Sequence, residues 1–228
     1  MAIPRTGCSP SSGAQIRGVL FDFGGVVLRT PFELIDDWER RTGAPHTPAR
    51  GPFSAPGEDV DFEAVGEGTL TERSYWLRRS LAAEPWLVPS DEDPTRRFIR
   101  AVYAGPESHL VRGEVLHLLD ELDGLHLGVL TNDLHDFHGQ AWVDDLTVLD
   151  RFAFVVDGSL TGVLKPDRRA YQIALEHFDL PAEHVLFVDD QPVNLTGAER
   201  VGLRTLRFDP TDPQASCDAV RSIVTGAS

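Results

Sequence analysis

Three short apolar runs that each end in polar side chains constrain the fold of this chain more than any other feature. They are residues 19–21, followed by Asp22; residues 129–130, followed by Thr131 and Asn132; and residues 185–188, followed by Asp189 and Asp190. Continuous apolar runs of this length are typical of parallel strands with both faces buried. In an open parallel sheet the carboxyl ends of the strands meet at one edge, so these polar residues would converge there.

Helical patterns alternate with strand patterns along the second half of the chain. Residues 112–122 carry apolar side chains at helical spacing and lead directly into a strand at 125–130. Further strands are expected at 152–156 and 185–188, with a helix at 166–178 between them. This alternation predicts a parallel sheet that helices cover on both faces. The expected fold class is α/β, with a Rossmann-like, doubly wound parallel sheet as its core.

Residues 30–108 do not follow this alternation. Three helical patterns, at 32–38, 75–81 and 98–103, are expected there, with a loop rich in Pro and Gly at 43–57. We interpret the segment as a helical insertion that covers the carboxyl edge of the sheet. Its aromatic residues, such as Trp38 and Tyr75, would either form a small core or line the covered site. The predicted division is a flexible tail at 1–15, an α/β core domain at 16–29 and 109–228, and a helical cap domain at 30–108.

The charge and the cysteine content limit the partners and the compartment. A net charge of -15 argues against nucleic acid and anionic membranes, because clustered Lys and Arg side chains hold phosphate groups. Cys8 and Cys217 lie in the two terminal regions, so no disulfide framework is expected. No apolar run has the length of a membrane span, and residues 1–13 lack the apolar segment of a signal peptide. We expect a cytoplasmic monomer or homodimer whose partner is a small molecule.

The residues expected at the sheet edge have the chemistry of a Mg²⁺-assisted phosphoryl-transfer site. Asp22, Asp189 and Asp190 would supply the oxygen ligands that Mg²⁺ prefers, while Thr131 and Lys165 would add a hydroxyl and an ammonium group. Each residue taken alone has an ordinary structural explanation. An Asp after a strand commonly forms a turn or caps a helix, and a lysine is commonly solvated. Their occurrence together, each behind the right element, favours a site.

In this order the motifs resemble the haloacid dehalogenase superfamily, in the branch with a helical cap after the first motif. The similarity runs from about Gly18 to Asp209 and includes a turn at 66–72 and the segment 162–167 followed by Tyr171. The resemblance implies a Mg²⁺-dependent phosphatase, a phosphoric monoester hydrolase. Its substrate would be a small phosphorylated metabolite such as a sugar phosphate.

The same resemblance implies roles for the residues that act on the substrate. Asp22 would attack phosphorus and form an aspartyl-phosphate, which water then hydrolyses. Thr131 and the Asn132 amide would donate hydrogen bonds to the phosphoryl oxygens, and Lys165 would hold both the phosphoryl group and Asp22. Arg29 and Asn194 are further candidates for contacts with the substrate.

The resemblance also implies the ligands of Mg²⁺. They are the Asp22 carboxylate, the backbone carbonyl of Gly24 and the Asp190 carboxylate, with Asp189 acting through water. Gly24 departs from the family pattern, because phosphatases of the family usually carry a second Asp there as general acid and base. Such a group contributes on the order of 10² to 10⁴ in rate. The open explanations are a slow phosphatase, a substrate with a good leaving group, a proton donor from the cap, or a protein without catalysis that binds or regulates.

Two other assignments are weaker. In 2-haloacid dehalogenation the same aspartate displaces halide without a metal, but Gly24 and the adjacent carboxylates Asp189 and Asp190 weigh against this reaction. His135 and His138 are close enough in sequence to suggest a metal cluster with neighbouring aspartates. We interpret them instead as the exposed polar face of a short helix.

Overall fold

The computed structural model describes residues 14–226, and a single parallel sheet organises them. The strand order is β3-β2-β1-β4-β5, with β1 (Gly18–Phe21), β2 (His126–Thr131), β3 (Phe154–Asp157), β4 (Val185–Asp189) and β5 (Arg204–Arg207). The central strand β1 pairs in parallel with both β2 and β4. The predicted α/β class with a Rossmann-like parallel sheet is confirmed.

Helices follow each strand of the sheet. Those between β1 and β2 are α1 (Pro31–Thr42), α2 (Val60–Gly66), α3 (Glu72–Ala83), α4 (Pro94–Val102), α5 (Glu107–Leu110), α6 (Gly113–Glu121) and the 3₁₀ helices η1 (Gly51–Phe53) and η2 (Glu84–Trp86). Those after β2 are α7 (Leu134–His138), α8 (Gln140–Asp144), α9 (Gly158–Thr161), α10 (Arg168–Phe178), α11 (Pro192–Glu199), α12 (Pro213–Thr225) and the 3₁₀ helices η3 (Thr147–Arg151) and η4 (Ala182–His184).

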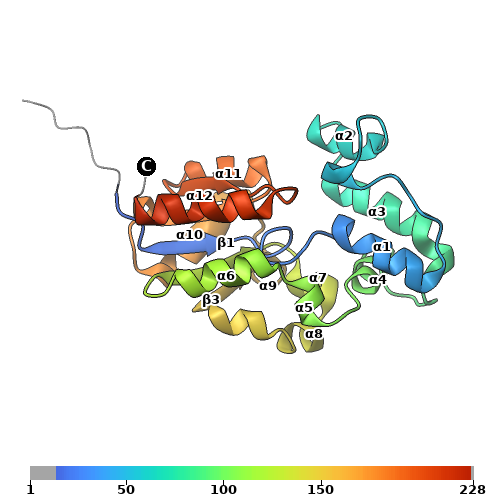
Figure 1. Cartoon of the computed structure of the whole chain (residues 1–228), viewed down its shortest axis with the longest axis horizontal. Coiled ribbons are helices and arrows are strands. Elements are labelled where there is room, and N and C mark those ends of the chain that lie inside the picture. The colour runs from blue at the N-terminus through green and yellow to red at the C-terminus, as the bar shows by residue number, and fades with distance from the viewer. Residues whose placement is uncertain (1–13, 227–228) are drawn as a thin grey trace, which may run out of the picture.

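Alternate side chains of β1 enter two separate hydrophobic clusters, one on each face of the sheet. Val19 and Phe21 belong to the larger cluster, together with side chains of α6 and α12. Leu20 belongs to the other cluster, together with side chains of α10 and α11. These helices run along the sheet in Figure 1. Burial on both faces explains why the strands are continuous apolar runs and not alternating ones.

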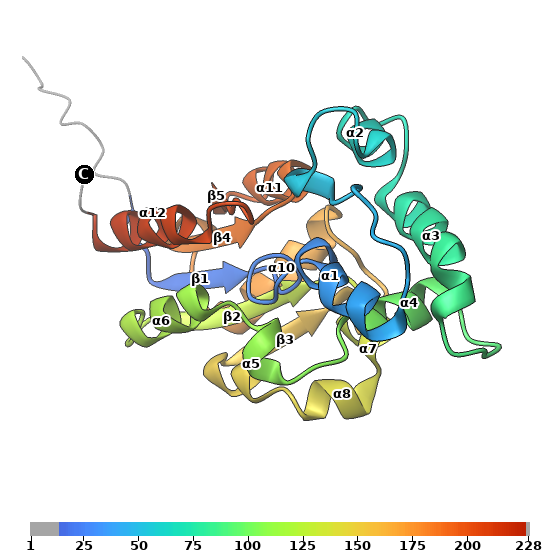
Figure 2. The same ribbon diagram turned by 45° about the vertical axis from the view of Figure 1, so that its right-hand side comes forward.

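Helices α1 to α4 form a group beside the carboxyl ends of the strands, as Figures 1 and 2 show from two directions. The aromatic rings of Phe32, Tyr75 and Trp76 pack against one another, and Trp38 meets Phe98 edge to face. Trp38 and Tyr75 are 4% and 1% exposed and pack against the other aromatic rings, so both residues belong to the core of this helical group. The proposed limits of a cap at residues 30–108 stay a prediction.

Several details differ from the sequence analysis or lie outside the structure. Strand β5 was not predicted: in its sequence RTLR only Leu206 is buried, so the strand lacks an apolar run. Cys217 is a free, buried thiol on α12, while Cys8 and most of the predicted tail lie outside the described residues. No helix within residues 14–226 combines the length and the apolar character that a membrane crossing needs.

Candidate active site

Asp22 lies immediately after the central strand, where the sheet ends. Its backbone N–H donates to the carbonyl oxygen of Val188 on β4 at 2.8 Å, and the N–H of Phe23 donates to its Oδ1 at 2.6 Å. The side chain is 11% exposed. Burial raises the pKa of Asp22 to about 7, with a further contribution from Asp189, although the neighbouring ammonium of Lys165 acts in the opposite direction. The carboxylate is therefore held in one orientation in a poorly solvated place.

Lys165 joins Asp22 to Asp189. Its Nζ lies 2.8 Å from Asp22 Oδ1 and 2.8 Å from Asp189 Oδ2, and its side chain is 1% exposed. Burial alone would lower the pKa of Lys165, but the attraction of the two carboxylates outweighs it and raises that pKa. The group is therefore a fixed ammonium ion, and the segment between α9 and α10 reaches the sheet edge as predicted.

Two asparagines hold this ion pair in place. Asn132 Oδ1 accepts from the backbone N–H of Lys165 at 2.8 Å, and its Nδ2 donates to the Lys165 carbonyl at 3.2 Å. Asn194 Nδ2 lies 3.1 and 3.0 Å from the two carboxylate oxygens of Asp189. Asp189 Oδ1 also accepts from the N–H of Gln191 at 2.8 Å, so both oxygens of Asp189 already have donors. The side-chain amides of Asn132 and Asn194 are thus engaged with the protein itself.

Asp190 is different, because its carboxylate makes no hydrogen bond or ion pair with any other residue of the described part of the chain. Carboxylate oxygens of Asp22, Asp189 and Asp190 lie within 4.8 Å of one another. Burial, followed by repulsion from Asp189 and Asp22, raises the pKa of Asp190 well above its ordinary range. A Cβ on Gly25 would come within 2.8 Å of Asp190 Oδ2, so only glycine leaves room for the carboxylate there.

These three carboxylates have the composition of a divalent-cation site. Against their three negative charges stands one ammonium group, that of Lys165. Mg²⁺ binds such sites through one or two carboxylates and further oxygen atoms. The unpartnered carboxylate of Asp190 and the space that Gly25 leaves for it fit a bound Mg²⁺ ion.

The remaining predicted residues lie around this group. Thr131, at the end of β2, is 6% exposed, and its hydroxyl has no hydrogen-bond partner within residues 14–226. Gly24 is exposed, and a Cβ there would meet no atom within 4 Å. Arg29 is half-buried, and its carbonyl accepts from the Tyr103 hydroxyl at 2.6 Å. The Arg29 guanidinium makes no ion pair in the described part of the chain, so no contact places it in the site.

One supporting residue, Arg112, has no signal in the local sequence. It is 2% exposed and pairs with both carboxylate oxygens of Glu33 at 2.8 and 2.6 Å. Its Nε and Nη2 also donate to the carbonyl of Gly25 at 3.3 and 3.2 Å. Glu33 in turn accepts from the backbone N–H of Thr30, in a capping box whose T-x-x-E pattern is readable in the sequence. Arg112 therefore fixes the loop after β1 against the first helix of the insertion.

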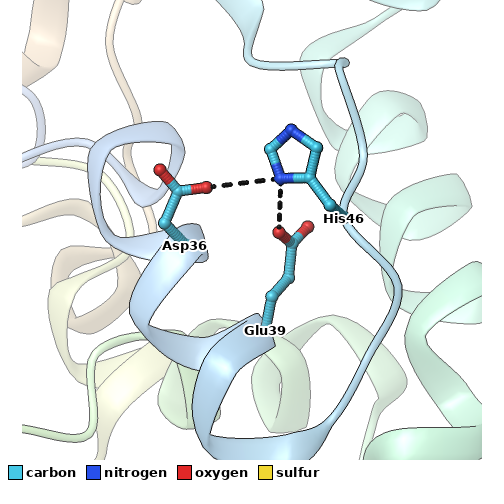
Figure 3. A group of neighbouring side chains, drawn as sticks. All are labelled: Asp36, Glu39 and His46. Carbon is cyan, nitrogen blue, oxygen red and sulfur yellow. Dashed lines mark hydrogen bonds and ion pairs between the residues drawn. The ribbon is translucent and has the colours of Figure 1, made fainter.

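A second group of possible metal ligands lies on the insertion, away from the sheet edge. Figure 3 shows Asp36 and Glu39 of α1 with His46, whose Nδ1 lies 3.8 Å from Asp36 and 3.2 Å from Glu39. The guanidinium of Arg50 already occupies this place, with Nη2 2.5 Å from Asp36 and 2.9 Å from Glu39. We therefore interpret this group as an ion-pair network that ties the loop after α1 to that helix.

The interpretation of His135 and His138 as an exposed polar face is wrong. His138 is 8% exposed and stacks on Trp142 with ring centroids 3.9 Å apart, and burial lowers its pKa to about 3. His135 Nδ1 lies 2.7 Å from Asp157 Oδ2, at the end of β3. Both side chains of helix α7 make contacts with other parts of the fold, which a polar pattern over five residues does not indicate.

Comparison with known proteins identifies relatives for most of the chain. The pattern of haloacid dehalogenase-like hydrolases matches residues 16–202. Acyl-CoA dehydrogenase family member 10 of Mus musculus is 27% identical over 212 residues, which cover 87% of this chain and 18% of that protein. Phosphoserine phosphatase of Thermus thermophilus is 33% identical over 181 residues, which cover 68% of this chain and 72% of that enzyme. The chain thus spans less than a fifth of the mouse relative.

Solved structures of similar hydrolases share the fold of this chain. The HAD-hydrolase YfnB from Bacillus subtilis, in a form with bound magnesium, superimposes with a TM-score of 0.61 at 19% identity. The superposition covers 86% of this chain and 87% of that one. At this level of identity the likeness concerns the fold alone.

Proposed function

Because the chain belongs to the haloacid dehalogenase-like hydrolase family, we propose that it is a Mg²⁺-dependent phosphatase of a small phosphorylated metabolite. The observation that carries this proposal is the carboxylate of Asp190, which lies beside Asp22 without a partner in the described residues. In dehalogenation without a metal, a haloacid would bring another negative charge to three carboxylates that only the Lys165 ammonium offsets. Phosphatases named among the relatives support the same choice of chemistry.

Mg²⁺, when bound, would offset the charge of the carboxylates and of the phosphoryl group. We assign its ligands to the Asp22 and Asp190 carboxylates and to the carbonyl of Gly24. Asp189 would act through water, because both of its oxygens already accept hydrogen bonds from Asn194. The cation is therefore assigned to the open side of the carboxylate group, where Asp190 has no other contact.

Asp22 would be the nucleophile, since the Phe23 N–H and the Lys165 ammonium orient its carboxylate. Its oxygen forms a bond to phosphorus, the bond from phosphorus to the ester oxygen breaks, and an aspartyl-phosphate results. Water then attacks phosphorus and releases phosphate and the free carboxylate. The Thr131 hydroxyl, which has no partner within residues 14–226, would donate to a phosphoryl oxygen.

Asn132 would contribute through its main chain and through Lys165. Its side chain is used in two hydrogen bonds to the Lys165 backbone, so we assign the donation to phosphate to its main-chain N–H. Asn194 would also act indirectly, because its side-chain amide holds the carboxylate of Asp189 and not the substrate. We further propose that α1 to α4 form a cap and that the substrate is a small phosphate ester bound between cap and sheet.

A panel of substrates tests this function. Phosphate esters and 2-haloacids would be assayed with Mg²⁺ and with a chelator, and the release of phosphate and of halide followed. We expect phosphate release that needs Mg²⁺. Halide release that persists in chelator would show dehalogenation instead, and no release of either product would indicate a binding or regulatory protein.

Asp190→Asn is expected to stabilise the metal-free protein at neutral pH and to remove most of the stabilisation by Mg²⁺. Burial raises the pKa of Asp190, so its ionised form disfavours the folded state. This cost is absent at low pH and grows as the pH rises above the ordinary pKa of an Asp, which is about 4. Bound Mg²⁺ raises stability by mass action. The substitution removes both the cost and a ligand.

Thermal unfolding with chelator and with Mg²⁺, at about pH 5.5 and about pH 8, measures both effects. The exposed Asp123, in the turn before β2, offers Asp123→Asn as a control with the same change of charge. Wild-type protein and control should gain thermal stability with Mg²⁺ at the higher pH. An equal gain in Asp190→Asn would contradict the ligand assignment.

A further inference from the structure

None of the residues assigned so far to the metal or the nucleophile at the sheet edge can protonate the leaving group. Cleavage of an alkyl phosphate ester expels a strongly basic alkoxide, which departs readily only if an acid donates a proton to it. The attraction of two carboxylates raises the pKa of Lys165, so its ammonium is a poor acid. Asp189 is an acceptor in every contact it makes, and Asp190 is assigned to the cation. Gly24 has no side chain.

Glu72 brings a carboxyl group to this edge from the insertion. It is the first residue of α3, whose N-cap Thr71 accepts from the N–H of Ser74 at 3.1 Å. Glu72 Oε1 accepts from the indole Nε1 of Trp76 at 3.3 Å. Glu72 Oε2 accepts from Gln191 Nε2 at 3.4 Å, and Gln191 directly follows Asp190. The insertion therefore contacts the core next to the carboxylate assigned to the metal.

The surroundings of Glu72 favour its protonated form. Glu72 keeps access to solvent, but desolvation of its carboxyl beside Trp76 and Gln191 is the largest cause that raises its pKa, followed by the charges of Asp133 and Asp189. The start of a helix favours the ionised form, but the partial desolvation of the carboxyl and the neighbouring carboxylates act against it and raise the pKa. The charged groups that act on the carboxyl are Asp133, Asp189, Asp190 and Lys165. Asp133 itself faces the guanidinium of Arg73 at 3.7 Å, whereas Glu72 makes no ion pair in the described part of the chain.

We propose that Glu72 is the general acid of the reaction, supplying from the insertion the proton that no side chain at Gly24 can give. This role rests on the proposed phosphatase function. In an in-line displacement the leaving oxygen departs on the side of phosphorus opposite the attacking oxygen. Asp22 attacks from the end of β1, so the leaving group faces the helices beside the sheet edge, where α3 begins.

The proton balance closes over the two steps. In the first, the bond from phosphorus to the ester oxygen breaks and that oxygen takes the proton of the Glu72 carboxyl, giving an alcohol and the Glu72 carboxylate. In the second, this carboxylate accepts a proton from the water that attacks the aspartyl-phosphate. The bond from phosphorus to Asp22 then breaks, and phosphate, the Asp22 carboxylate and the Glu72 carboxyl are restored.

Glu72→Gln tests the role, because the amide keeps the size of the side chain but has no acidic proton. A series of phosphate monoesters with Mg²⁺ would run from p-nitrophenyl phosphate to ethyl phosphate. We expect kcat/KM to fall on the order of 10²-fold for ethyl phosphate and much less for p-nitrophenyl phosphate, whose leaving group needs no proton. The matched control is Glu67→Gln, which removes an exposed charge from the turn that precedes α3.

A second substitution tests the same role by rescue. The Cβ of an aspartate in place of Gly24 would have no atom within 4 Å. Gly24 is also not among the glycines with positive φ, so the backbone there accepts a side chain without strain. Gly24→Asp in the Glu72→Gln protein should restore hydrolysis of ethyl phosphate, because the new carboxyl can donate the missing proton. If the double variant is as slow as Glu72→Gln alone, then loss of proton donation is not what slows the Glu72→Gln protein.

The outcomes separate the two proposals. Wild-type protein that cleaves no ester of the series overturns the phosphatase function and this role with it. Wild-type protein that cleaves the esters, with a Glu72→Gln variant that loses the same factor on every ester or loses nothing, overturns the role of Glu72 alone. A loss confined to esters with basic leaving groups, absent in Glu67→Gln, is the expected result.

Discussion

Asp22→Asn is expected to lower turnover by a factor on the order of 10⁴ or more while the protein keeps its fold. Asn has nearly the same shape as Asp, so the acceptor for the N–H of Phe23 and for the Lys165 ammonium remains. It lacks the negative charge that attacks phosphorus. Neither of the other two carboxylates is expected to replace that charge, because Asp189 is already bound to Lys165 and Asn194 and Asp190 is assigned to the cation.

The same substitution should not destabilise the protein at neutral pH. Burial raises the pKa of Asp22 from 3.8 to about 7, so the ionised carboxylate costs stability as the pH rises between these two values. Asn carries no charge and avoids this cost. Turnover of the preferred ester and thermal unfolding at neutral pH measure the two effects, with Asp123→Asn as the control. Near-normal turnover in a folded Asp22→Asn protein would show that Asp22 is not the nucleophile.

The sheet edge could be predicted because the end of each strand is a local property of the sequence. An apolar run and the polar residue that ends it are adjacent in sequence, so Asp22, Thr131 and Asp190 are found from the chain alone. The parallel sheet then brings them together by its geometry. Strand β5 escaped this reasoning because an edge strand needs little apolar surface, and in it only Leu206 is buried.

Apart from the pairing of Lys165 with Asp22, which the family resemblance implied, the partners within the site could not be predicted, because they join residues far apart in sequence. Asn132 was expected to face the phosphoryl group, yet its side chain holds the backbone of Lys165, 33 positions away. Arg112 and Glu33 are 79 positions apart. Which atom each polar group contacts depends on how the elements pack, and no periodicity in the sequence records it. The prediction that His138 is exposed was wrong for the same reason. Tertiary contacts bury its side chain, although the residues around it in the sequence are polar.

Lys165→Met is expected to be the most destabilising single change in the site. Asp189 is fully buried, and the Lys165 ammonium lies 2.8 Å from its Oδ2. Breaking a buried ion pair by removing one partner costs about 3–5 kcal/mol, because an uncompensated charge stays inside. In a protein of this size, about 1 kcal/mol corresponds to roughly 2–4 °C in Tm. Turnover should also fall to near the background rate, since the phosphoryl group and Asp22 lose their cation.

A double variant, Lys165→Met with Asp189→Asn, separates the two losses. It removes the buried charge together with its partner, so much of the lost stability should return, because replacing both members of a buried pair is often neutral. Activity should not return, since no ammonium remains to hold the phosphoryl group. Denaturant unfolding and turnover of the four proteins of this cycle give the coupling between the two residues. If Lys165→Met alone unfolds as the wild-type protein does, then Asp189 does not depend on this ammonium, and the asparagine and backbone donors around it are sufficient to hold its charge.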